Sequence, residues 1–182
     1  MKKQRIQQEL RDLARLLLLS GLDEPAAMRA ELAEAIRSDL PEVVDAERQA
    51  EEWLADARRD AATDPLPVPS DDDRLAAAFA ECRRAGLAVL IGVEDHWSAK
   101  RELERAEAAG LGLRGVLWFT RADVWHSIDA GMLEVNLWHS TTANAAPGDA
   151  LLDEVVAILA RHGLRAHFDE GRIEVAARWR RN

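Results

Sequence analysis

The sequence predicts an α+β protein with an N-terminal three-helix region, followed by a small mixed sheet of about five strands layered with helices and ending in a β-hairpin. Apolar residues recur at helical spacing through the first region, and a proline-rich segment then interrupts the chain. Beyond it, short apolar runs bounded by glycines alternate with amphipathic segments. The predicted organisation is a helical region at 1–62, a Pro-rich connector at 63–70 and an α+β domain at 71–182.

Apolar spacing and helix-end residues define the three N-terminal helices. Ile6, Leu10, Leu13 and Leu17 follow one another at spacings of four, three and four residues, which is one stripe of an amphipathic helix. A Ser-Gly pair ends this helix. Capping acidic residues and early prolines then predict two further starts, at Asp23-Glu24-Pro25 and at Leu40-Pro41-Glu42.

Helices and short strands alternate in the predicted α+β domain. Strands are expected at 87–93, 115–119 and 132–139, and a terminal hairpin turns at Asp169-Glu170-Gly171. Helices are expected at 70–86, 97–109, 120–131 and 149–163, where capping residues and glycines mark the ends. Short strands and a closing hairpin favour a layered α+β sheet over a doubly wound nucleotide-binding fold.

Composition excludes several classes of function. Among 182 residues the formal charge is −9, which disfavours nucleic acid, because phosphate binding needs a basic surface. No apolar run approaches the length of a signal peptide or a membrane span. The only cysteine is Cys82, which suits a reducing cytoplasm. Three of the 24 basic residues are lysines and the rest are arginines, a bias typical of a high-GC bacterial genome. We expect a cytoplasmic protein without a cofactor.

No catalytic motif is present, but Trp, His and Ser recur together. The triplets are His96-Trp97-Ser98, Trp125-His126-Ser127 and Trp138-His139-Ser140. If the first and third strands are parallel, their carboxyl ends bring Glu94, Asp95 and His96 near His139. The candidate cleft therefore contains Glu94, Asp95, His96, Trp97, Trp125, His126, Trp138 and His139. His96, His126 and His139 are weak metal-ligand candidates, and the competing interpretation places the tryptophans in the core or at its rim.

Three segments resemble the centre of a bacterial family of domains of unknown function. They are Thr63-Asp64 and the run Asp71-Asp72-Asp73-Arg74-Leu75 to Phe79, followed by Ala85-Gly86-Leu87. The later path is also similar, with a strand ending at Trp118-Phe119 and a hairpin closing at Arg172-Ile173. The resemblance implies an architecture and no activity. Family members often carry a cysteine after the first strand, where this chain has Val93 to Trp97, so no metal or redox chemistry is carried over.

Three functional hypotheses remain. The first is a non-catalytic binding or regulatory protein, with another protein as its partner and with an inhibitor or toxin-neutralising role as its specific form. The alternative is a metal-binding protein or hydrolase-type enzyme that uses a His/Asp cluster at the strand ends. The third is a homodimer formed through the N-terminal helices, motivated by Trp53 on a sparsely apolar helix.

Overall fold

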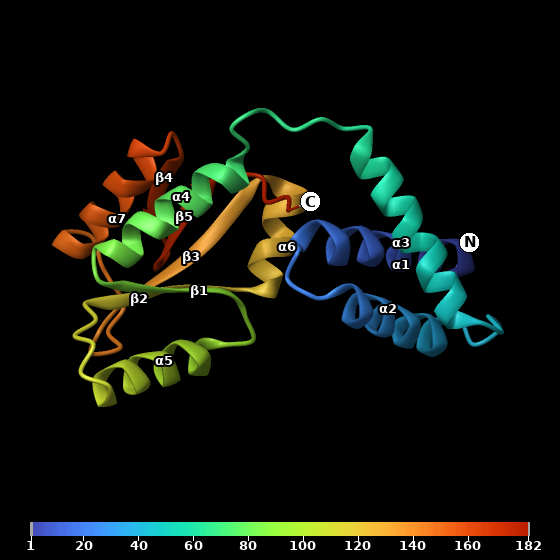
Figure 1. Cartoon of the computed structure of the whole chain (residues 1–182), viewed down its shortest axis with the longest axis horizontal. Coiled ribbons are helices and arrows are strands. Elements are labelled where there is room, and N and C mark those ends of the chain that lie inside the picture. Colours follow the sequence, from blue (N-terminus) through green and yellow to red (C-terminus); the bar gives the residue numbers. More distant parts are fainter. Residues whose placement is uncertain (1, 182) are drawn as a thin grey trace. The chain divides into compact units, whose positions relative to one another are not determined.

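The computed structural model describes residues 2–181 and divides into two compact units (Figure 1). The helical unit comprises Met1–Pro67 with Arg180–Asn182, and the α+β unit comprises Val68–Trp179. Each unit has its own core. No helix in the described part of the chain is long and apolar enough to cross a membrane.

Three helices form the helical unit, namely α1 (Lys2–Ser20), α2 (Pro25–Asp39) and α3 (Ala46–Ala62). Their apolar stripes meet in a core that fully buries Leu17, Leu32 and Ile36. Helix α2 begins with a proline, whose missing N–H would have no partner there in any case. Helix α3 begins after Asp45, whose carboxylate accepts a hydrogen bond from the Arg48 backbone N–H.

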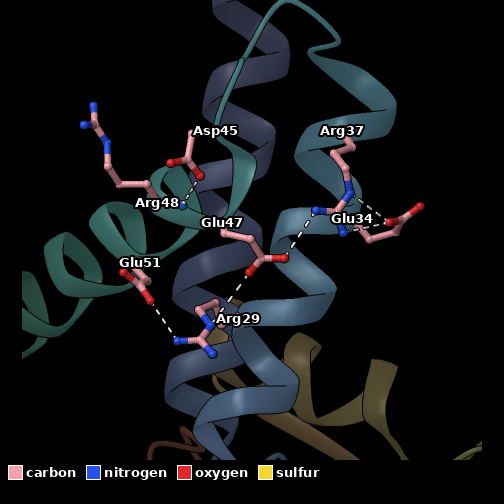
Figure 2. Close-up of polar contacts among 7 residues, drawn as sticks. All are labelled: Arg29, Glu34, Arg37, Asp45, Glu47, Arg48 and Glu51. Carbon is pink, nitrogen blue, oxygen red and sulfur yellow. Dashed lines mark hydrogen bonds and ion pairs between the residues drawn. The ribbon is translucent and has the colours of Figure 1, made fainter.

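Ion pairs on the surface link α2 to α3 (Figure 2). Arg29 contacts Glu51 at 2.7 Å and Glu47 at 3.8 Å. Arg37 contacts Glu34 at 3.0 Å and Glu47 at 3.3 Å. The hydrogen bonds that Arg37 donates to the Glu34 and Glu47 carboxylates raise the pKa of its guanidinium. Because all these side chains are solvent-exposed, the network orients the two helices but adds little stability.

The α+β unit confirms the predicted fold class. It contains a five-stranded mixed sheet with the strand order β1-β2-β3-β5-β4. The chain runs through α4 (Asp71–Arg84), β1 (Leu87–Val93), α5 (His96–Ala108), β2 (Gly115–Thr120), α6 (Arg121–Ala130), β3 (Met132–His139), α7 (Ala150–Arg161), β4 (Arg165–Asp169) and β5 (Arg172–Ala176). Strands β4 and β5 form the predicted terminal hairpin around Glu170-Gly171, both of which have positive φ.

The directions of β1 and β3 differ from the parallel arrangement on which the predicted cleft was based. Strands β1 and β2 are parallel, but β2 and β3 are antiparallel, with Gly115 opposite His139. Strands β1 and β3 therefore run in opposite directions. Because Val93 lies opposite Thr120, the residues that follow β1 leave the sheet at the other end from His139. The parallel direction of β1 and β3, on which the expected convergence of Glu94, Asp95 and His96 on His139 depended, is wrong.

Helices cover the sheet unevenly. Helices α4 and α7 lie on one face, and α5 lies on the other face over β1 and β2 (Figure 1). Beneath α5, Val116 and Trp118 pack against Ala99 and Leu103. The same face carries polar side chains farther along the sheet, where Glu134 and Glu174 occupy matching positions on β3 and β5.

Candidate functional site

An aromatic cluster lies where α5 begins, above β2 and β3. The Trp118 and Trp138 rings meet edge to face, with centroids 5.3 Å apart. The His96 ring lies 6.4 Å from Trp138 and 4.7 Å from Trp97. Lys100 extends over the Trp97 ring at 5.3 Å, within the range of a cation–π interaction. We call His96, Trp97, Lys100, Trp118 and Trp138 the α5 aromatic cluster.

The start of α5 positions this cluster. Asp95 is the N-cap, and its carboxylate accepts hydrogen bonds from the backbone N–H groups of Trp97 at 2.9 Å and Ser98 at 3.3 Å. This cap fixes the first turn, which carries both His96 and Trp97. On the sheet, Trp118 and Trp138 project from neighbouring strands toward the same face.

Side-chain exposure in the cluster increases from the tryptophans on the sheet to the tryptophan on α5. Trp118 is 7% exposed, and its Nε1 is buried without a hydrogen-bond partner. Trp138 is partly buried, whereas Trp97 is 50% exposed. The ring beside Trp97 is that of His96, which is itself exposed. A half-exposed tryptophan leaves apolar area in water that a partner can cover.

The structure brings together only part of the sequence-predicted cleft. His96, Trp97 and Trp138 share the α5 aromatic cluster. Trp125 and His126 lie on α6, where Trp125 packs against Arg121 with the guanidinium carbon 5.4 Å from the ring centroid. Trp125 is partly buried, and His126 is exposed.

His139 belongs to a separate polar contact. Its Nε2 lies 2.9 Å from Asp149 Oδ2, and the same carboxylate oxygen accepts the Ala146 backbone N–H at 2.8 Å. These two contacts, led by His139, lower the pKa of Asp149. Because Asp149 also precedes α7, the pair closes the loop between β3 and α7.

The metal form of the alternative needs a group of several ligating side chains. Within residues 2–181, no group of three or more His, Cys, Asp or Glu side chains is arranged to hold a metal ion. Burial raises the pKa of the Cys82 thiol to about 11, so this cysteine is a poor nucleophile at neutral pH.

A groove lies at the other end of α5, bordered by Leu103, Glu107, Leu113, Ser140 and Thr141. Its volume is about 510 Å³, and it is widely open to solvent. Its polar lining comprises the Glu107 carboxylate and the exposed hydroxyl groups of Ser140 and Thr141.

Three residues of these contacts were not among the predicted site residues, namely Lys100, Trp118 and Asp149. Lys100 follows Trp97 by three residues on a helix, a spacing that places both side chains on one face, so the sequence contained that signal. Asp149 follows His139 by ten residues across an irregular loop, and no periodic pattern connects them.

Fold and site together define a two-unit α+β protein whose mixed sheet carries an aromatic cluster under and beside one helix. The chain belongs to the family described as Domain of unknown function (DUF6891), whose model matches residues 3–182. Among curated proteins and among solved structures, no significant match to the chain is found.

Proposed function

We propose that this protein is a non-catalytic binding or regulatory protein of the cytoplasm, and that the α5 aromatic cluster contacts its partner, another protein. The half-exposed ring of Trp97 carries the proposal. Tryptophan is enriched among the residues that contribute most to protein–protein affinity, because it buries a large apolar area with few rotatable bonds.

The surroundings of Trp97 fit such an anchor. The Trp97 ring lies beside the His96 ring, which in turn lies 6.4 Å from Trp138 on the sheet, and Lys100 extends over Trp97. Neighbours that restrict a ring before binding lower the entropy lost when a partner covers it. Lys100 and the adjacent Glu94 supply exposed charges at the rim, where polar residues surround an apolar centre.

Charge favours a basic partner. The chain carries 33 acidic and 24 basic residues, so a basic protein is attracted to it over a longer range than an acidic one. An inhibitor or toxin-neutralising protein that covers a basic surface is the specific form of this proposal.

The test is capture of partners from the native cell by the full-length protein and by two variants. Trp97→Ala removes the anchor, and Leu111→Ala removes an exposed apolar side chain, 67% exposed, in the turn after α5. We expect a stoichiometric partner with the wild type and with Leu111→Ala. We expect at least about a tenfold lower affinity with Trp97→Ala, as for an interface anchor.

Circular dichroism must show both variants folded. Capture of the same partner by wild type and Trp97→Ala with equal affinity would remove the α5 aromatic cluster from the interface. The absence of any stoichiometric partner would contradict the proposed function itself.

A further inference from the structure

The two edges of the sheet differ in how they are protected against pairing. At the β4 edge, Arg165, His167 and Asp169 are exposed and alternate along the strand. Charged side chains on an edge strand discourage another strand from adding to the sheet. The other edge is β1, which reads Leu-Ala-Val-Leu-Ile-Gly-Val and contains no charge and no proline.

Exposure shows that the β1 edge is open within the α+β unit. Neighbouring β2 is covered by the same layers, and five of its six residues are buried. In β1 only Leu87 and Val89 of seven residues are buried, although α4 and α5 pack on its two faces. The remaining exposure of β1 therefore comes from its edge.

Arg83 identifies an accessible backbone acceptor on this strand. Its guanidinium donates to the Val89 carbonyl oxygen at 3.4 Å, a long and weak hydrogen bond. A bulge follows between Leu90 and Val93, where Gly92 has a φ of 63°. The regular part of β1 is thus the segment before the bulge, centred near Val89.

Opposite charges flank the two ends of β1. Arg83 and Arg84 end the preceding helix and are exposed, whereas exposed Glu94 directly follows the strand. An antiparallel copy of this strand would place its acidic end beside the basic end of the first. A parallel copy would instead bring like charges together.

We propose that the β1 edge pairs antiparallel with β1 of a second copy of this chain, about a two-fold axis near Val89. In this arrangement Glu94, which follows β1 in one copy, lies at the same end of the joined edge as Arg84, the last residue of α4, in the other. The two sheets join into one, and the Arg83 side chain moves aside as strand hydrogen bonds replace its contact with Val89. The interface is isologous, so each charge pair forms twice.

Sedimentation equilibrium of the purified full-length chain at low salt tests this assembly. Arg84→Glu and Glu94→Arg each turn two attractive contacts into repulsive ones, and the double variant restores the attraction with the charges exchanged. We expect each single variant to weaken the dimer at least about tenfold and the double variant to return to within about threefold of wild type. Asp169→Arg, on the β4 edge, is the matched control and leaves dimerisation unchanged.

Hydrogen exchange locates the interface independently of charge. We expect the Val89 and Ile91 amides to gain protection as protein concentration rises. A monomer at every concentration overturns the proposal. So does a dimer that is indifferent to the single reversals, or concentration-dependent protection confined to α1–α3. These readouts use the purified chain alone and do not depend on the partner proposed for Trp97.

Discussion

Trp97 and Trp118 differ in exposure because they occupy different positions relative to the sheet. On α5 the buried residues are Ala99, Leu103 and Ala106, at spacings of four and three. Trp97 precedes Ala99 by two residues and so lies on the opposite side of the helix. Trp118 lies on a strand whose face is covered by that helix. The exposure of Trp97 was therefore contained in the sequence, because helical spacing alone places it off the buried stripe.

At Gly115 the backbones of β2 and β3 lie too close together for a side chain. A Cβ atom there would lie 2.2 Å from the Trp138 carbonyl oxygen, which cannot be accommodated without moving the backbone. We predict that Gly115→Ala lowers the free energy of unfolding by about 1–3 kcal/mol, the usual cost of overpacking. Urea unfolding followed by tryptophan fluorescence measures it.

Gly112→Ala is the control for that substitution. Gly112 has a φ of 60°, but a Cβ there meets nothing within 4 Å, so alanine brings backbone strain without a clash. A loss of stability for Gly115→Ala no larger than that for Gly112→Ala would contradict the close approach.

At the scale of elements, a three-residue ionic contact joins α4 to α7. Glu81 accepts from Arg161 at 2.5 Å and contacts His162 Nε2 at 2.7 Å. These contacts, Arg161 first, lower the pKa of Glu81. A carboxylate whose pKa is lower folded than unfolded stabilises the fold above its unfolded value and loses that contribution as pH falls through the folded value.

We therefore predict a pH-dependent effect for Glu81→Gln. The variant is less stable than wild type at neutral pH, and the difference shrinks below about pH 4, where the wild-type carboxylate becomes protonated. Urea unfolding from neutral to acidic pH measures the difference. Glu104→Gln, which removes an exposed pair with Lys100 at 3.8 Å, is the control and should show a smaller difference. A difference for Glu81→Gln that stays constant with pH would contradict the ionic contact.

Element types and order were predictable because most helix ends carry caps or glycines, β1 to β3 contain short apolar runs, and β4 and β5 alternate around a turn. The direction of β3 was predicted incorrectly, although the length of the connection before it indicated the correct one. The connection between β2 and β3 spans residues 121–131, and parallel neighbours need a crossover of a dozen residues or more. A short connecting helix is consistent with antiparallel strands, and that orientation separates His139 from Glu94 and Asp95.

At the scale of the whole molecule, the last residues of the chain are divided between the two units. Trp179 is fully buried in the α+β unit, where the centroid of its ring lies 5.7 Å from that of the Phe119 ring. Its backbone N–H donates to the buried Ser127 hydroxyl at 3.0 Å. Arg180 belongs to the helical unit, where it is 7% exposed and contacts Asp64 at 2.9 Å. Two adjacent residues are thus buried in two different units. The segment is too short for a periodic pattern to predict this division.

The candidate site was predictable only in part for the same reason. Helical and strand periods fix which face of its own element a residue occupies, but they do not say which elements lie side by side. Contacts that cross loops, such as His139 with Asp149, depend on chain paths that local pattern does not encode. The tryptophans were found from composition, whereas their grouping required the sheet register.

The most direct test of the proposed partner surface is site-specific photo-cross-linking in the native cell, with a photoreactive phenylalanine derivative placed at position 97. We predict a single adduct with a different, basic protein at position 97 and none from the same derivative at position 111. An adduct only with a second copy of this chain, equal adducts from both positions, or none at position 97, would contradict it.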